Sequence, residues 1–213
     1  MKTPVTAQSL KHHFAYSWWM YLLVLLAGIF LVDLMFTVTA PRVPEEKKVD
    51  FYISGNVDTE KLEAYTEKVR TQEMPNLETI QTVTLYMDDQ YGPMQLMTYI
   101  AAGEGDVYLL GRENFLSLAS EDAFVPLETN PELMETLSGV DLQRGWRKNT
   151  ETGENHLYGI PQDKIPGLIR YAYCENGFLC VLNSSKNEEN ALKFLNILCR
   201  DMLNAENTEP SEE

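Results

Sequence analysis

The chain has 213 residues, of which 44% are hydrophobic, and its 32 acidic and 17 basic side chains leave a formal net charge of −15 at pH 7. The acidity is concentrated after residue 42, where 31 Asp and Glu face 14 Lys and Arg, a net of −17. Because such a surface repels phosphates and anionic lipid headgroups, nucleic acid is excluded as a partner. About 170 residues outside the hydrophobic N-terminal stretch suffice for one domain with its own core.

Residues 14–38 form an apolar stretch with a single charged residue, Asp33, and we expect a transmembrane helix there. At about 1.5 Å per residue this helix would measure roughly 37 Å, enough to cross about 30 Å of bilayer hydrocarbon. Trp18, Trp19 and Tyr21 lie in its first third, as interfacial anchors do. Asp33 lies near the end of the span, where it either contacts a partner in the membrane or reaches the headgroups; the sequence leaves both readings open.

A cleaved signal peptide is the alternative to a retained anchor. Residues 38–40, Val-Thr-Ala, have the small-residue spacing that a signal peptidase reads. Pro41 would follow the cut, however, and the apolar run is longer than the hydrophobic region of such peptides, so retention is favoured. Residues 1–13 would then be a short cytoplasmic tail. The positive charges do not set the orientation, because both sides of the span carry them: Lys2 and Lys11 on one, Arg42, Lys47 and Lys48 on the other.

Residues 39–48 contain two prolines and four consecutive charges, which predicts an extended spacer. The soluble domain is expected over residues 49–204, followed by an acidic disordered tail, residues 205–213. Strand and helix patterns alternate in the first half of the domain, which predicts a parallel α/β arrangement. The expected order is strand 49–55, helix 58–72, strand 79–87, helix 93–102 and strand 106–111.

The second half of the domain is less regular. It is expected to contain helix 112–120, an extended turn at 122–128, helix 130–137, a loop over 139–155 and a short strand at 156–161. Residues 168–183 hold two β-rich runs around Asn176-Gly177, which predicts a hairpin. A last helix is expected at 187–203, with one apolar face made of Ala191, Phe194, Leu195, Leu198 and Met202.

Three segments follow one another in the order found in a known family. Residues 103–128 combine the strand sequence Asp-Val-Tyr-Leu-Leu with a helix and an apolar-Pro-Leu turn, residues 156–161 read HLYGIP, and residues 178–198 place Ser-Lys-Asn between a strand and a helix with Ala-Leu-Lys-Phe-Leu. Together they resemble the extracellular solute-binding proteins of ABC importers, family 1. The resemblance implies an α/β lobe like half of a periplasmic-binding-protein fold, with three layers.

The chain departs from this family in one large feature. In the family a second lobe is built after the segment that resembles YGIP, whereas here only residues 162–177 separate the two matching segments, too few for a lobe. Because the family binds its ligands between lobes, half of the usual site is missing. The resemblance implies a non-enzymatic, single-pass membrane protein with its C-terminal domain outside the cell, acting as an accessory or interaction subunit of a transport or sensory complex. The alternative is a reduced receptor that binds a sugar or peptide on an open face.

Trp146 and Tyr158 are the candidate ligand-binding residues, since aromatic rings stack on sugars; core or turn roles would give the same pattern. Four carboxylates gather at expected strand ends: Asp88, Asp89, Glu104 and Asp106. A solvated face is expected, and a cation site is the alternative, although the calcium-loop spacing is missing. The sequence has no phosphate loop and no G-x-S-x-G motif, so we expect no catalytic residue, no metal and no cofactor.

Cys174 and Cys180 flank the tip of the expected hairpin. A two-residue turn would point the two thiols to opposite faces, whereas a three-residue turn would set them opposite each other and allow a disulfide. The alternative is that both are small buried apolar residues, as expected for Cys199 on the last helix.

Overall fold

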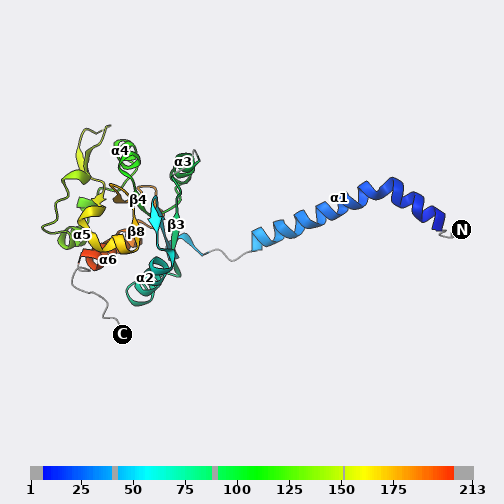
Figure 1. Ribbon diagram of the computed structural model, residues 1–213, viewed down its shortest axis with the longest axis horizontal. Coiled ribbons are helices and arrows are strands. Elements are labelled where there is room, and N and C mark those ends of the chain that lie inside the picture. Colours follow the sequence, from blue (N-terminus) through cyan, green and yellow to red (C-terminus); the bar gives the residue numbers. More distant parts are fainter. Residues whose placement is uncertain (1–6, 40–42, 88–90, 151, 204–213) are drawn as a thin grey trace. The chain divides into compact units, whose positions relative to one another are not determined.

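Figure 1 shows the computed structural model of the chain, in which residues 7–39, 43–87, 91–150 and 152–203 are described. The chain divides into two compact units, Met1–Arg42 and Val43–Glu213. The first unit contains helix α1 (Ala7–Thr39), and the second is a mixed α/β domain. The expected acidic tail, residues 205–213, lies outside the described residues.

Helix α1 contains the expected apolar span. Its segment Trp18–Thr39 has a mean hydropathy of 2.4 and is long enough to cross a membrane, and large apolar side chains such as Phe30 are exposed along it. A helix of this kind at the N-terminus fits a membrane anchor or a signal sequence. The helix begins at Ala7, so part of the expected tail, residues 1–13, is helical. The reason is that no Pro or Gly interrupts the chain between Pro4 and Gly28.

The last residues of the expected spacer, 39–48, belong to the folded domain. Glu45–Lys47 form a 3₁₀ turn (η1), and strand β1 (Lys48–Ile53) starts directly after it. The Lys47 carbonyl accepts a hydrogen bond from the Glu78 amide at 2.7 Å, and Lys47 Nζ lies 2.9 Å from Glu78 Oε1. These contacts fix the entry of the chain into the sheet.

The main sheet has the strand order β3-β1-β4-β9-β7. Strands β1, β3 (Thr79–Thr84) and β4 (Val107–Leu110) are parallel, with Phe51 opposite Thr82 on one side and Val107 on the other. Strands β9 (Phe178–Val181) and β7 (Ile160–Pro161) extend the sheet in antiparallel fashion. The expected strand, helix, strand, helix, strand order of the first half is confirmed.

Helices cover both faces of this sheet (Figure 1). Val49, Phe51 and Ile53 of β1 pack into the core shared with α2 (Thr59–Gln72) and α6 (Glu188–Leu203). Tyr52 points to the other face and packs with Leu96 of α3 (Gly92–Ala102) and Phe115 of α4 (Arg112–Ser120). This alternation along β1 is the period of two that a strand between two layers requires.

The helix predictions hold closely. Asp58 caps α2 by accepting a hydrogen bond from the Lys61 amide, and Leu62, Tyr65 and Val69 are buried as expected. The predicted apolar face of α6 is buried as well. Asn130 caps the short helix α5 (Pro131–Thr136), which follows the 3₁₀ turn η2 (Leu127–Thr129).

The predicted hairpin at residues 168–183 is wrong. Its first run becomes a 3₁₀ helix, η5 (Pro166–Arg170), and a short strand, β8 (Ala172–Tyr173), which pairs with β2 (Asn56–Val57). Its second run is β9, which pairs with β4 and β7 instead. All four residues of β9 are buried, so placing this run inside the main sheet removes more apolar surface from water than an isolated hairpin would.

The expected loop over residues 139–155 also contains structure. Strand β5 (Trp146–Lys148) pairs with β6 (Asn155–Leu157), and the 3₁₀ turn η3 (Gln143–Gly145) precedes it. With only three residue pairs, this ribbon is too short to give a recognisable periodicity. Between residues 162 and 177 the described elements are η4 (Gln162–Lys164), η5 and β8.

Candidate functional site

The largest pocket described lies where the parallel strands end. It has a volume of about 650 Å³ and is formed by the segments that follow the carboxyl ends of β1, β3 and β4, together with residues 173–176. In α/β folds this edge of the sheet is where ligands most often bind, because loops and helix starts converge there. Its main polar and aromatic side chains are Ser54, Asn56, Tyr86, Arg112, Glu113, Asn114, Tyr173, Glu175 and Asn176.

Ser54 fixes the floor of this pocket. Its hydroxyl donates to the Leu109 carbonyl at 2.9 Å and accepts from the Gly111 amide at 3.2 Å, so it joins the ends of β1 and β4. The next residue, Gly55, passes so close to β8 that an added Cβ would lie 2.3 Å from the Tyr173 carbonyl oxygen. A side chain at position 55 would therefore displace Tyr173 from the pocket.

Helix α4 supplies backbone donors to the same pocket. It starts directly after Gly111, and Arg112, Glu113 and Asn114 of its first turn line the cavity. The amides of a first helical turn have no acceptor within the helix, and the helix dipole adds positive potential there. With the Arg112 guanidinium, this end of the pocket offers hydrogen-bond donors to ligand oxygens, while Glu113 and Glu175 bring two carboxylates to the same pocket.

Two exposed tyrosines give the pocket apolar surface. Tyr86 follows β3 and is 74% exposed, and Tyr173 in β8 is 47% exposed. Polar groups beside exposed aromatic rings are the combination that proteins use for small polar molecules with a flat apolar face, sugars among them.

The two candidate ligand-binding residues lie elsewhere. Tyr158 is fully buried, and its hydroxyl donates to Asp122 Oδ1 at 2.6 Å and accepts from Asn149 Nδ2 at 3.2 Å. Trp146 is partly buried in β5 and packs against the core on the α2 and α6 side of the sheet. Tyr158 thus offers no ring face to a ligand, and ligand contact by Trp146 stays a prediction.

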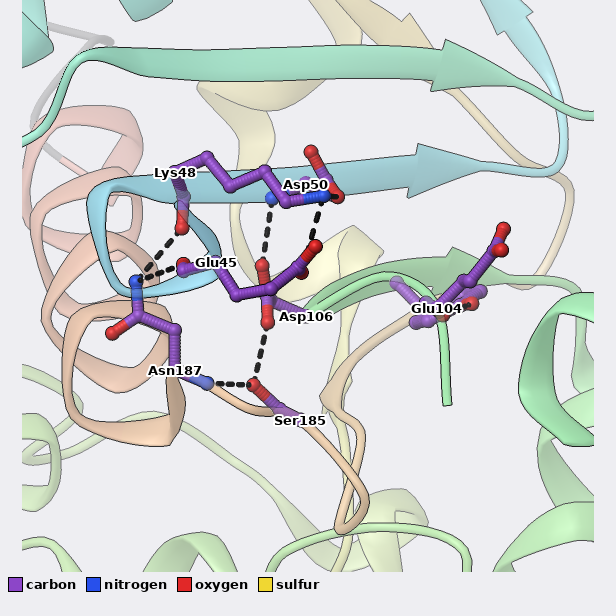
Figure 2. Close-up of polar contacts among 8 residues, drawn as sticks. Glu45, Lys48, Asp50, Glu104, Asp106, Ser185 and Asn187 are labelled. Carbon is purple, nitrogen blue, oxygen red and sulfur yellow. Dashed lines mark hydrogen bonds and ion pairs between the residues drawn. The ribbon is translucent and has the colours of Figure 1, made fainter. Parts of the chain in front are cut away.

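Two of the four carboxylates that were expected to cluster, Glu104 and Asp106, lie at the other edge of the sheet. Asp106 precedes β4 and is buried, accepting from the Asp50 amide at 2.8 Å and from the Ser185 hydroxyl at 2.5 Å; Figure 2 shows it between these two residues. Burial raises the pKa of Asp106. Glu104 is exposed, and Asp88 and Asp89 lie outside the described residues. Glu104 and Asp106 therefore lie at the amino end of β4, and not at the carboxyl ends of the strands, where α/β folds place ligands.

All three cysteines are free and buried. Cys180 Sγ lies 3.6 Å from the Tyr108 carbonyl inside the main sheet, whereas Cys174 Sγ lies 3.8 Å from Ser54 Oγ at the base of the large pocket. Cys174 and Cys180 are thus not bonded to each other: Cys174 follows β8, whereas Cys180 lies in β9 of the main sheet. Burial raises the pKa of each thiol, so all three are protonated at neutral pH.

Sequence reasoning missed the residues that line the large pocket. None belongs to a motif, and the misplaced hairpin hid the approach of Tyr173 to Gly55. Two signals were available at the ends of the predicted strands, Ser54-Gly55 and Gly111-Arg112. Within the described residues no group of three or more His, Cys, Asp or Glu side chains is placed to hold a metal ion.

No family model and no curated protein matches this chain. Among solved structures it is similar to an extracellular solute-binding protein family 1 from Alicyclobacillus acidocaldarius, with 25% identity and a TM-score of 0.42. It is also similar to the N-glycan transport solute-binding protein of Streptococcus pneumoniae, with 18% identity and a TM-score of 0.36. An ABC transporter solute-binding protein from Agrobacterium vitis, solved with bound D-mannitol, has 17% identity and a TM-score of 0.36.

These likenesses are partial. They cover 57%, 54% and 54% of this chain and only 28%, 24% and 26% of the three proteins. This chain therefore spans about a quarter of the length of each of these three proteins.

Proposed function

We propose that the chain is a membrane-anchored, non-enzymatic module whose α/β domain lies outside the cytoplasm and binds a small polar solute at the carboxyl edge of its parallel strands. The observation that carries this proposal is the pocket of about 650 Å³ with its polar floor, the start of α4 and two exposed tyrosines. The sequence resemblance to family 1 solute-binding proteins supports the same class of function. A sugar or a short peptide fits the mixture of hydrogen-bonding and aromatic groups.

The openness of the site sets the expected affinity. With one lobe the solute stays partly in water, so fewer of its groups are desolvated than in a closed cleft. We therefore expect millimolar binding or somewhat tighter, about −4 kcal/mol or more favourable. Such affinity suits a receptor that samples solute at high local concentration.

The test is a thermal-shift and calorimetric screen of sugars, amino acids and short peptides against the full chain in detergent micelles. The expected result is saturable binding of one solute class, weakened about tenfold by Asn114→Ala or Tyr173→Ala. Glu135→Gln, an exposed change outside the pocket, serves as the control. If no solute binds, or if Glu135→Gln weakens binding as much as the pocket variants do, this function loses its basis.

A second candidate is an accessory subunit of a transport or sensory complex, which binds a protein partner. Helix α3 favours it: in an acidic domain it contains no charged residue, and Met94 and Met97 are 61% and 42% exposed. Uncharged exposed surface with methionines is typical of protein contacts. Affinity purification from membranes should then recover the same transporter or receptor subunit with the wild type and lose it with Met97→Glu. If Met97→Glu recovers the same subunit as the wild type does, α3 is not the contact with the partner.

A further inference from the structure

A second, smaller pocket lies on the α3 and α4 face of the sheet, at the amino ends of the strands. It has a volume of about 290 Å³. Asp50 and Tyr52 of β1 and Gln81 of β3 line it, because residues 50 and 52 point to the same face and Asp50 pairs with Gln81. Helix α3 ends at Ala102 beside this pocket, and Glu104 and Lys186 complete its wall. It lies at the edge of the sheet opposite the large pocket.

One oxygen atom in the wall of this pocket has no hydrogen-bond donor among the residues that the structure describes. Asp50 is only 8% exposed; its Oδ2 pairs with Lys48 Nζ at 2.8 Å, and its amide donates to Asp106 Oδ2. Its Oδ1 is buried and has no partner within the described residues. Figure 2 shows this carboxylate beside the Lys48 ammonium. A buried carboxylate oxygen without a hydrogen-bond donor costs free energy. A ligand with a hydrogen-bond donor would remove this cost.

The electrostatics of the pocket select the charge of that ligand. Asp50, Glu104 and Glu45 contribute carboxylates, and the C-terminus of α3 adds its negative partial charge. Burial, followed by the negative charges of Asp50 and Glu104, raises the pKa of Tyr52 to about 12. Lys48, which is paired with Asp50 and Glu45, and Lys186 offset part of this potential, so that three carboxylates face two ammonium groups. A cation is therefore favoured over a neutral or anionic molecule.

The donor requirement narrows the choice further. The described residues place no group of three or more His, Cys, Asp or Glu to hold a metal ion, and a metal ion donates no hydrogen bond. The Tyr52 ring is 6% exposed and packs between Tyr99 and Tyr108, with centroids 5.1 and 5.0 Å away, so it closes the wall beside Asp50 without offering a free face. We propose that this pocket binds a small primary ammonium compound, whose NH₃⁺ group donates to Asp50 Oδ1.

The test compares three probes of similar size on the full chain in detergent micelles, by isothermal titration calorimetry. Butylammonium carries charge and donors, tetramethylammonium carries charge without an N–H donor, and butanol is neutral. We expect butylammonium to bind saturably and about tenfold more tightly than either control, because a charge-assisted hydrogen bond is at stake. Equal binding of butylammonium and tetramethylammonium, or no saturable binding of butylammonium, would overturn the proposal.

Four variants connect the binding to this pocket. Asp50→Asn should weaken butylammonium binding about tenfold. Two exposed changes leave the fold intact and act in opposite directions: Glu104→Gln should weaken binding and Lys186→Gln should strengthen it, each by about two- to fivefold. Glu135→Gln, far in sequence from the pocket, should leave it unchanged. If Glu104→Gln and Lys186→Gln both bind as the wild type does, the ligand is held elsewhere and the assignment fails.

Discussion

Tyr158 shows how a single residue can look like a ligand contact and serve the fold instead. Its hydroxyl joins Asp122 and Asn149, two residues from separate turns. Asp122 has a φ of 57°, in the left-handed region that non-glycine residues seldom adopt. The bond from Tyr158 thus helps to hold a strained turn between α4 and the bridge of Phe124 to Leu182.

Tyr158→Phe should therefore lower the free energy of unfolding by about 1–3 kcal/mol, because two buried or partly buried partners lose the hydroxyl. The measurement is urea unfolding of the full chain in micelles. Tyr86→Phe, at a 74% exposed position, should change stability by no more than about 0.5 kcal/mol. Equal effects in the two variants would contradict a structural role for the Tyr158 hydroxyl.

His156 links the short ribbon of β5 and β6 to the turn at η2. Its Nδ1 lies 2.6 Å from Glu128 Oε1, and the other Glu128 oxygen accepts from the Leu157 amide at 2.9 Å. The hydrogen bond to Glu128 raises the pKa of His156, despite some loss of hydration. Since the folded pKa lies above the unfolded value of about 6.5, this contact stabilises the fold fully below that pH and less as the pH rises through the folded pKa.

We expect His156→Gln to lower the melting temperature more at pH 5.5 than at pH 8.5. Part of the imidazole is exposed to solvent, so the difference between the two pH values should be at most about 1 kcal/mol, or roughly 2–4 °C. Thermal unfolding at both pH values, wild type beside variant, measures it. If His156→Gln lowers the melting temperature equally at pH 5.5 and pH 8.5, the ion pair between His156 and Glu128 does not contribute to stability.

At the scale of elements, the first half of the domain could be predicted and much of the second half could not. The Asp58 cap and the spacing of the buried residues Leu62, Tyr65 and Val69 predict helix α2. Four consecutive apolar residues predict strand β4. These signals are local. The partners of β8 and β9 are not, because each pairs with a strand more than 65 residues earlier in the chain, Asn56 with Tyr173 and Leu110 with Phe178. The large pocket depends on those pairings and was missed with them.

Asn187 connects two elements that are distant in sequence. Its Nδ2 donates to the Lys48 carbonyl at 2.7 Å and to the Glu45 carbonyl at 3.3 Å, and its amide donates to the Ser185 hydroxyl at 3.1 Å. The residue is 9% exposed and directly precedes α6. It thereby ties the start of α6 to the point where the chain enters the sheet, as Figure 2 shows.

Asn187→Ala should lower the free energy of unfolding by about 1–3 kcal/mol, because the carbonyls of Lys48 and Glu45 lose a buried donor. Asn190→Ala is the matched control, since the hydrogen bond that its side chain donates goes to Asn187 Oδ1 and not to the entry segment. The midpoints of urea unfolding compare the two variants. If the urea midpoint falls equally in Asn187→Ala and Asn190→Ala, the contacts of Asn187 with the entry segment do not stabilise this end of the domain.

For the whole molecule, the N-terminal helix and the acidic domain have to be considered together. A domain with 31 acidic and 14 basic side chains is repelled by anionic lipid, so the apolar helix is what would hold it at a membrane. The helix fits an anchor or a signal sequence by its composition. The two alternatives predict different mature proteins: a retained helix keeps residues 1–39, and cleavage after Ala40 leaves a chain that begins with Pro41.

We expect the mature protein to keep its N-terminal helix and to expose the domain on the outer side of the membrane. Pro41 disfavours cleavage after Ala40, and the apolar segment is long enough to span. Mass spectrometry of the protein purified from membranes distinguishes the retained chain from one beginning at Pro41.

A cysteine placed at the exposed position Glu135 then reports orientation, because a membrane-impermeant maleimide labels it in intact cells only if the domain is outside. The native thiols are buried and should stay unlabelled, which makes the wild type the control. Labelling of this variant only after lysis would place the domain in the cytoplasm and exclude an extracytoplasmic receptor.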